Sequence, residues 1–241
     1  MLRNKTRLAA EALDTNHPCQ ATLRLFRRES PVRVLGPYAR AVIWVQGCHF
    51  HCPGCIVPES WDSANGFAAP VSELAEWAVT QPADIEGITL SGGEPLNQAG
   101  VLCGLIDKIQ SRRDMGVVCY TGYTLDYLRE RGSLEQQALL RRIDLLIDGV
   151  YQAGLHGNLL WRGSANQRIQ LLTPRYAAVV ENLLDERGDR SAGVEAVIDG
   201  DGTIGLAGVP FSPMFREEFL RRMSARGIRI AAGDGQREQQ S

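Results

Sequence analysis

Short, mostly apolar runs recur along most of the chain, and amphipathic stretches separate them. Four runs are apolar at nearly every position, which is typical of strands buried on both faces of a sheet. They cover residues 41–45, 87–90, 116–120 and 143–147. Residues 22–27 alternate leucines with polar neighbours and predict a further short strand.

Apolar residues spaced as on one face of a helix separate the later strands. They predict helices from a cap at Ser72 to about Thr80, and over residues 101–109, 125–131 and 134–141. Strands that alternate with helices indicate an α/β fold, with a parallel sheet and helices outside it. Between residues 56 and 70, two prolines and an Asn-Gly pair predict a long loop.

The pattern divides the chain into three parts. Residues 1–20 are polar and aperiodic and form an N-terminal arm, residues 21–173 form the core, and residues 174–241 form a small C-terminal α+β extension. The extension is predicted to begin with a helix opened by Thr173-Pro174 that buries one stripe of side chains. That stripe is Tyr176, Val179, Val180, Leu183 and Leu184.

The rest of the extension is predicted to be a β-hairpin followed by a helix. The hairpin strands are residues 194–198 and 203–206, and Asp199-Gly200-Asp201-Gly202 forms the turn between them. Ser212-Pro213 opens the last helix. This helix is expected to bury Phe215, Phe219 and Met223.

Composition and charge exclude several classes of function. A net charge of −2 over 241 residues gives no electrostatic footprint for nucleic acid or an acidic membrane surface. No apolar run is long enough to span a bilayer, and the N-terminus lacks the apolar stretch of an export signal, so we expect a cytoplasmic protein. In that compartment the six cysteines are expected to be metal ligands or buried apolar residues rather than disulfides.

Four loops of unusual sequence each follow a predicted strand. In α/β folds, ligands bind beyond the carboxyl ends of the strands, so these loops are expected to meet at one edge of the sheet. The loops are the cysteine-rich segment 48–55, Gly92-Gly93-Glu94, Thr121-Gly122-Tyr123 and Asp148-Gly149.

Three cysteines lie within eight residues, at Cys48, Cys52 and Cys55. Three thiolates can hold iron or zinc, but they are one short of the usual full set, which leaves a metal position open to a small molecule. A zinc site completed by His49, His51 or a distant thiol is the alternative, although both histidines are expected to be solvated loop residues. Cys103 and Cys119 lie in apolar patterns and are expected to be small buried hydrophobic residues, while Cys19 has no assigned role.

The Cys-x3-Cys-x2-Cys spacing resembles the signature of the radical S-adenosylmethionine (SAM) enzymes. Further blocks, in order along roughly residues 35–172, resemble the activating proteins of anaerobic ribonucleotide reductases and related glycyl-radical activases. These blocks are residues 44–55, 58–62, 90–96, 120–124, 146–149 and 161–168. Asn166 and Arg168 lie in the last block without a physical role that the sequence explains.

The resemblance implies a partial (β/α) barrel of the radical SAM type and two cofactors. Cys48, Cys52 and Cys55 would bind three irons of a [4Fe–4S] cluster, and SAM would chelate the fourth. Reductive cleavage of SAM would give a 5′-deoxyadenosyl radical that abstracts hydrogen from the substrate.

The resemblance also assigns residues to SAM. Glu94 would accept a hydrogen bond from the amino group of SAM, and Gly92 and Gly93 would let the backbone approach the ligand without a Cβ. The backbone at Gly54 would contact the adenine. Tyr123 and Asp148 are expected to form walls of the pocket.

The implied substrate is a glycine in a partner glycyl-radical enzyme, with a low-potential electron donor such as flavodoxin or ferredoxin. Two alternatives stay open: a radical SAM enzyme acting on a small metabolite or peptide, and a non-catalytic metal-binding module. The chain departs from the typical activases in having Ile56-Val57 after the third cysteine and Gly36-Pro37-Tyr38 where Gly-Pro-Gly is usual. It also continues for about seventy residues beyond Gln170, which bears on substrate choice.

Overall fold

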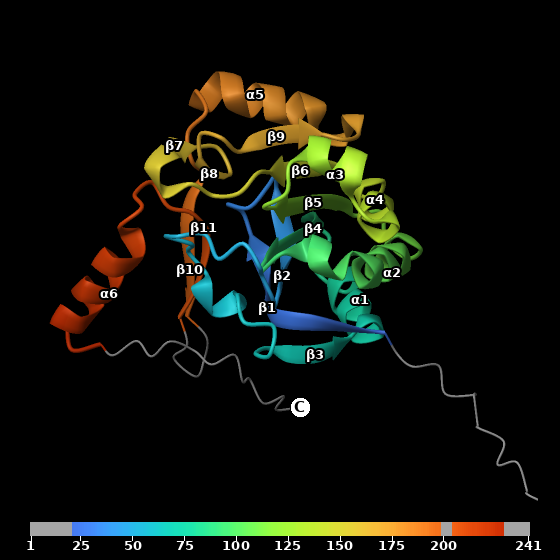
Figure 1. Ribbon diagram of the computed structural model, residues 1–241, viewed down its shortest axis with the longest axis horizontal. Helices are drawn as coiled ribbons and strands as arrows, with labels where there is room; N and C mark the ends of the chain where they lie inside the picture. The colour runs from blue at the N-terminus through green and yellow to red at the C-terminus, as the bar shows by residue number, and fades with distance from the viewer. Residues whose placement is uncertain (1–20, 199–203, 229–241) are drawn as a thin grey trace, which may run out of the picture.

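The computed structural model describes residues 21–198 and 204–228, and its central feature is a seven-stranded sheet (Figure 1). The order of strands across the sheet is β3-β1-β2-β4-β5-β6-β9. The strands are β1 (Thr22–Val32), β2 (Ala39–Val45), β3 (Phe67–Pro70), β4 (Ile85–Gly92), β5 (Gly116–Thr121), β6 (Leu145–Asp148) and β9 (Arg168–Leu171).

The sheet is parallel only at its centre. Strands β2, β4, β5 and β6 pair in parallel, as their apolar runs and intervening helices predict. The edges are antiparallel, because β1 pairs with both β2 and β3, and β9 pairs with β6. The predicted parallel sheet is therefore confirmed at the centre but not at the edges, and the structure is a mixed α/β fold. The expected loop over residues 56–70 is also partly wrong, because it contains a 3₁₀ helix (Pro58–Ser60) and ends in strand β3.

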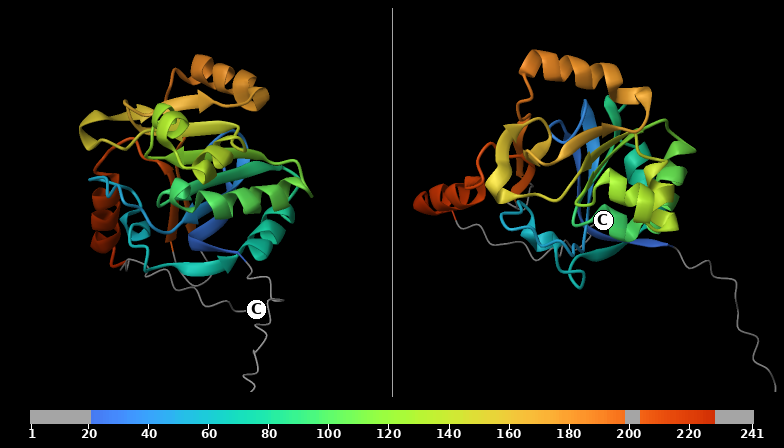
Figure 2. Two further views of the ribbon diagram at one scale, coloured as in Figure 1. Left: turned by 45° about the vertical axis from the view of Figure 1, so that its right-hand side comes forward. Right: turned by 45° about the horizontal axis from the view of Figure 1, so that its top comes forward.

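Four helices cover one face of the sheet (Figures 1 and 2). They are α1 (Val71–Val79), α2 (Ala99–Gln110), α3 (Leu125–Arg131) and α4 (Leu134–Leu140). Side chains of Ile43, Leu90 and Cys119 face these helices and share one apolar core with Leu105 of α2. The expected cap at Ser72 is wrong, because α1 follows Pro70 directly and has no side-chain cap.

The C-terminal third of the described chain covers the opposite face. Successive side chains of a strand point to opposite faces, so Val42, Trp44 and Val118 turn away from α1–α4. Val118 packs with Tyr176, which precedes α5 (Ala177–Arg187), and with Val180 of α5. Both are buried as predicted, whereas the other predicted members of the stripe are only partly buried: Val179, Leu183 and Leu184. Trp44 and Val42 pack with Ala207 of the hairpin formed by β10 (Gly193–Ile198) and β11 (Ile204–Val209).

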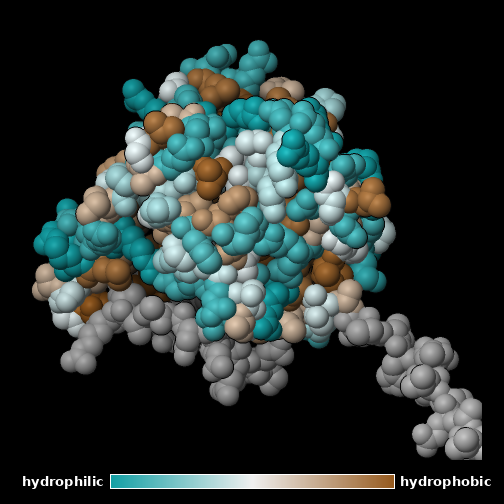
Figure 3. Space-filling model, in the orientation of Figure 1, coloured by the Kyte–Doolittle hydropathy of each residue, from teal (hydrophilic) through white to brown (hydrophobic). Residues whose placement is uncertain are grey.

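The antiparallel pairing of β10 and β11 confirms the predicted hairpin, while its turn residues 199–202 lie outside the described residues. A second hairpin, β7 (His156–Leu159) with β8 (Arg162–Ser164), precedes β9. The last helix, α6 (Phe215–Ala225), lies to one side of the sheet, where brown patches interrupt the teal surface (Figures 1 and 3). Its predicted burial is wrong: Phe215, Phe219 and Met223 are only half-buried. No helix among the described residues is long and apolar enough to cross a membrane.

Candidate active site

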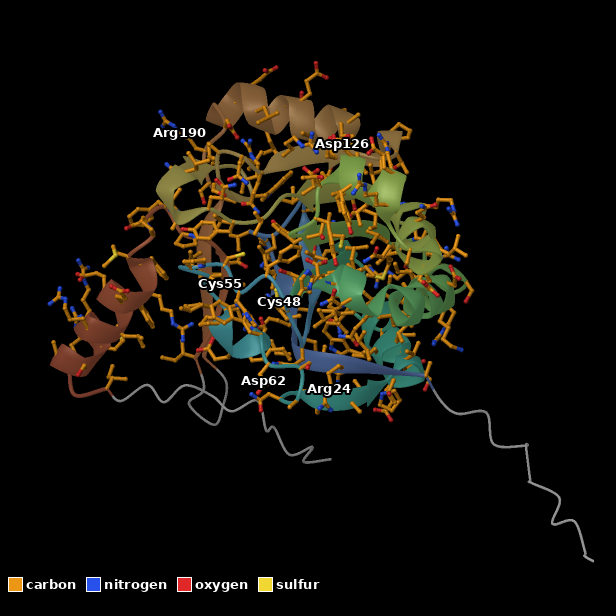
Figure 4. The ribbon with its side chains drawn as sticks, viewed as in Figure 1. Arg24, Cys48, Cys55, Asp62, Asp126 and Arg190 are labelled. Atoms are coloured by element: carbon orange, nitrogen blue, oxygen red, sulfur yellow. The ribbon has the colours of Figure 1, made fainter. Side chains whose placement is uncertain are left out.

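One cavity opens at the carboxyl ends of the parallel strands. Segments that follow β2, β4, β5 and β6 line it, as expected from their places along the chain. Their contributions are Cys48, Cys52, Gly54 and Cys55 after β2, Gly92, Gly93 and Glu94 at and after β4, Thr121 and Gly122 at and after β5, and Gly149 after β6. Figure 4 shows Cys48 and Cys55 near the middle of the molecule, between α6 and the helical face.

The start of the cysteine loop is held by hydrogen bonds to the segment that follows the loop. The Gly47 amide donates to Ser60 O at 2.8 Å, and the Cys48 amide donates to Trp61 O at 2.9 Å. Gln46, buried at the end of β2, donates its amide to Glu59 O at 2.9 Å and to Asp62 O at 2.8 Å. The loop therefore starts from a fixed point beside β4.

The three thiols are half-buried and free, and burial raises the pKa of each. Iron binding would oppose this effect, because a thiol that coordinates a metal releases its proton to solvent and binds as the thiolate. Among residues 21–198 and 204–228, no three His, Cys, Asp or Glu side chains converge where one ion could sit, and His49 and His51 are exposed. A [4Fe–4S] cluster needs no such convergence, since each cysteine binds a different iron. The donor set fits this cluster.

At Gly92 and Gly93, neighbouring backbone atoms occupy the space that a Cβ would need. A Cβ on Gly92, whose φ is +97°, would lie 2.6 Å from the Val45 amide nitrogen, and one on Gly93 would lie 2.4 Å from Gly47 O. Both glycines line the cavity. Glycine is required at both positions because β4 lies very close to the end of β2. The expected reason was that the backbone approaches a ligand.

Glu94 lies at the centre of the lining and is 1 % exposed. One carboxylate oxygen accepts from the Leu96 amide at 2.9 Å and from the Thr121 hydroxyl at 2.8 Å. The other accepts only from the Gly122 amide, at 2.8 Å. That second oxygen can accept one more hydrogen bond, which a ligand could supply. Burial raises the pKa of Glu94 to about 7 despite these three donors.

The described residues that line the cavity do not include Asp148 or Tyr123. The Asp148 carboxylate is fully buried, accepts from the Leu125 amide at 2.7 Å and forms an ion pair with Arg168 at 2.6 Å. Asp148 therefore caps α3, and this ion pair gives Arg168 the role that the sequence did not explain. Tyr123 packs its ring against Phe50 of the cysteine loop, at 5.1 Å between ring centroids.

The neighbours of Arg168 hold the loop after β6. Asn166 donates its amide to Val150 O at 2.7 Å, and Gln167 donates to Gly149 O at 2.9 Å. Gln167 also lines the cavity and accepts from the Gly163 amide at 2.8 Å. The Asn-Gln-Arg segment thus positions one wall of the cavity.

Several residues that line the cavity were not predicted from the sequence. Tyr120, Tyr151 and His156 line the cavity, and Tyr151 Oη lies 3.1 Å from His156 Nδ1. The hydroxyl of Tyr120 and Nε2 of His156 are buried without a hydrogen-bond partner in the described part of the chain. Buried polar atoms of this kind normally have partners, so they suit a polar ligand in the cavity. No local motif distinguishes these residues, and only the fold brings them together.

The C-terminal region also reaches the cavity. Val209, Pro210, Pro213 and Arg216 line it on the side of α6. This region belongs to the predicted C-terminal extension, which was expected to bear on substrate choice, although none of its residues was assigned to the cavity.

Comparison with known proteins identifies the core of the chain. The family described as 4Fe-4S single cluster domain matches residues 34–170. The chain is 32% identical over 140 residues to the anaerobic ribonucleoside-triphosphate reductase-activating protein of Enterobacteria phage T4, which covers 56% of this chain and 86% of the relative. It is 34% identical over 152 residues to the protein of that name from Vibrio cholerae, and 32% identical over 154 residues to that from Escherichia coli K12. These two matches cover 59% of this chain and 95% of each relative.

The matches agree with the site, because the matched residues 34–170 contain the three cysteines of the loop and Glu94. The remaining two fifths of the chain have no counterpart in these alignments. By its iron–sulfur domain and its relatives, the chain belongs to the family of anaerobic ribonucleoside-triphosphate reductase-activating proteins, which are glycyl-radical activases of the radical SAM superfamily.

Proposed function

We propose that this protein activates a glycyl-radical enzyme of the anaerobic ribonucleotide reductase kind by abstracting hydrogen from one of its glycines. The observation that carries the proposal is that one cavity brings together Cys48, Cys52 and Cys55 with Glu94. In the proposed reaction, a [4Fe–4S] cluster and SAM supply a 5′-deoxyadenosyl radical when both are bound and an electron arrives. The relatives, named for activating the reductase, support the choice of partner.

The three cysteines would hold the cluster. Each is half-buried on a loop whose start is bonded to residues 59–62, which fixes where the loop begins before the metal binds. The family match over residues 34–170 supports the cluster type. We also propose that the central parallel strands form a partial (β/α) barrel of the radical SAM type, with the cofactors at the carboxyl ends of its strands.

Glu94 would orient SAM. Its second carboxylate oxygen has room for one hydrogen bond, which the ammonium group of a SAM molecule would donate. A cation beside this carboxylate would lower its pKa from about 7 and keep it ionised. Tyr120 and His156 would satisfy other polar atoms of SAM, and the backbone at Gly54, which also lines the cavity, would face the adenine.

The test is a cleavage assay on protein purified without oxygen and reconstituted with iron and sulfide. Given dithionite and SAM, it is expected to produce 5′-deoxyadenosine and methionine. Addition of an anaerobic ribonucleotide reductase is then expected to give a glycyl-radical signal in electron paramagnetic resonance. Flavodoxin or ferredoxin is the proposed physiological donor in place of dithionite.

The outcomes separate the possible functions. Stoichiometric zinc without SAM cleavage would replace the proposal with a structural metal site. Cleavage without a glycyl radical, followed by deuterium transfer to a metabolite or peptide, would keep the chemistry and replace the substrate.

A further inference from the structure

Residues 209–216, which we call the C-terminal strap, lie beside the cavity although they follow Cys55 by more than 150 positions. Val209, Pro210, Pro213 and Arg216 of the strap form part of the lining. The family match ends at residue 170, so the strap lies outside the part that this chain shares with that family. The chain therefore supplies a wall of its own to the site.

The first end of the strap is fixed by the β10–β11 hairpin. Val209 is the last residue of β11, and its carbonyl accepts from the Ser191 hydroxyl at 2.7 Å. Two residues earlier, Ala207 is buried against Trp44 of β2. The strap thus leaves a hairpin that is packed on the central sheet.

The second end is fixed by Arg216. Its guanidinium binds both carboxylate oxygens of Glu59 and donates to Ile56 O at 2.9 Å. Glu59 belongs to the 3₁₀ helix that follows the cysteines and holds the start of their loop. A bidentate ion pair of this kind has a defined geometry. It is partly buried, because the side chains of Arg216 and Glu59 are 36% and 22% exposed. Arg216 therefore joins the strap to the flank of the cysteine loop.

We propose that the C-terminal strap closes one side of the cavity and limits access to the thiols, with Arg216 as the residue that positions it. The inference rests on the proposed function, since it states what restricts the approach of a partner's glycine to the site. Between its two ends, the strap contains two prolines, which stiffen the segment. Release of Arg216 would let the strap move away from the cavity and leave the hairpin in place.

The test measures alkylation of the thiols in the full-length protein without its cluster. Iodoacetamide is added under reducing, metal-free conditions, and modification of Cys55 is followed by mass spectrometry against Cys103, which lies half-buried on α2. Arg216→Gln and Glu59→Gln are each expected to speed alkylation of Cys55 relative to Cys103 by about three- to tenfold. This factor corresponds to the free energy that one partly buried ion pair contributes. Arg222→Gln, which breaks an exposed pair with Glu218 on the same helix, is the matched control and should leave the ratio unchanged.

The paired variants distinguish opening from a change of local charge. Burial dominates the raised pKa of Cys55, while the charge of Glu59 raises it and that of Arg216 lowers it. A purely electrostatic effect would therefore slow alkylation in Arg216→Gln and speed it in Glu59→Gln. Opposite directions, or no change in either variant, would overturn the proposal.

The exchanged variant Glu59→Arg/Arg216→Glu provides a second check. This variant is expected to restore slow alkylation of Cys55. If Cys55 is still alkylated fast in a variant with wild-type thermal stability, that result would contradict closure of the cavity by the strap. None of these measurements uses SAM or a loaded cluster. A failed cleavage assay and a failed strap test are thus separate results.

Discussion

Glu94 combines two roles in one carboxyl group. It joins the ends of β4 and β5 through Thr121 and Gly122, and it keeps one acceptor position that faces the cavity. Because the carboxyl is buried, a charge on it is costly until a cation binds beside it. The raised pKa of Glu94, about 7, reflects that cost.

This cost predicts a pH dependence of stability for the protein without cofactors. The folded state keeps a proton on Glu94 up to about pH 7, whereas the unfolded chain releases it near 4.5. The resulting stabilisation is fully present below pH 4.5 and is lost as pH rises through 7, by about 3 kcal/mol in total. Glu94→Gln removes this titration. Urea denaturation at pH 5 and pH 8 gives the unfolding free energies of wild type and variant. From pH 5 to pH 8, the wild type is expected to lose about 3 kcal/mol of stability relative to the variant. An equal difference at both pH values would contradict the raised pKa.

The cysteines predict a selective loss of iron. Cys52→Ala removes one of the three proposed ligands, so bound iron and the visible absorbance of the cluster should fall at least about tenfold. Cys103→Ala changes a half-buried thiol on α2 and should leave both unchanged. Iron analysis after anaerobic reconstitution tests the pair. Equal iron in both variants would show that Cys52 is not a ligand.

Sequence reasoning found the residues whose chemistry is concentrated in one short segment. Cys48, Cys52 and Cys55 could be selected from their spacing, and Glu94 could be selected from the resemblance of its segment to the family motif. His156 could not, since a single histidine between two short strands has no distinguishing pattern. Asp148 was expected to form a wall of the pocket, but its carboxylate binds Arg168 and the first amide of α3.

At the level of elements, the approach of β4 to β2 sets the shape of the site. The Gly93 amide donates to Val45 O, and the Glu94 amide donates to Gly47 O, each at 2.8 Å. These bonds continue the parallel pairing past the end of β4 and place Glu94 beside the start of the cysteine loop. A side chain at the glycines would separate the two segments.

Substitution of Gly92 tests this approach. Gly92→Ala puts a Cβ 2.6 Å from the Val45 backbone at a φ of +97° and should destabilise the protein by roughly 2–5 kcal/mol. Gly104→Ala is the control, because this glycine lies in α2 with nothing within 4 Å of its Cβ position. That change should stabilise the protein by about 1 kcal/mol. Urea denaturation of both variants measures the contrast, and similar effects of the two would argue against the close approach.

The predicted elements were correct where burial dictates the sequence. Strands β2, β4, β5 and β6 are apolar because both of their faces are covered. Strands β7, β8 and β9 were missed, since they are short, partly exposed and largely polar. The face of α6 was identified correctly, but periodicity shows which side chains share a face and not whether anything covers it.

At the scale of the whole molecule, Arg40 connects the sheet to the C-terminal region at the end opposite the cavity. Its fully buried guanidinium donates to Thr89 at 2.7 Å, Gly116 O at 2.7 Å and the Tyr176 hydroxyl at 2.9 Å. It also pairs with Glu86 at 2.9 Å. One side chain thus joins β2, β4, β5 and the start of α5.

Removal of this connection should be costly. Arg40→Met leaves buried carbonyls and a carboxylate without their donor, and is expected to lower the unfolding free energy by about 3–5 kcal/mol. Arg112→Gln breaks an exposed pair with Glu76 and should change stability little. The two arginines are compared by chemical denaturation of the protein without cofactors. A small effect at Arg40 would mean that water replaces its bonds.

The site draws on residues from both halves of the chain, and this has a consequence for biosynthesis. The cysteines and the first parallel strands leave the ribosome about 160 residues before Arg216. At ordinary rates of translation that interval is on the order of ten seconds. With the strap in its proposed role, each newly made molecule passes through a stage in which its thiols are uncovered, and we propose that iron is delivered during this stage.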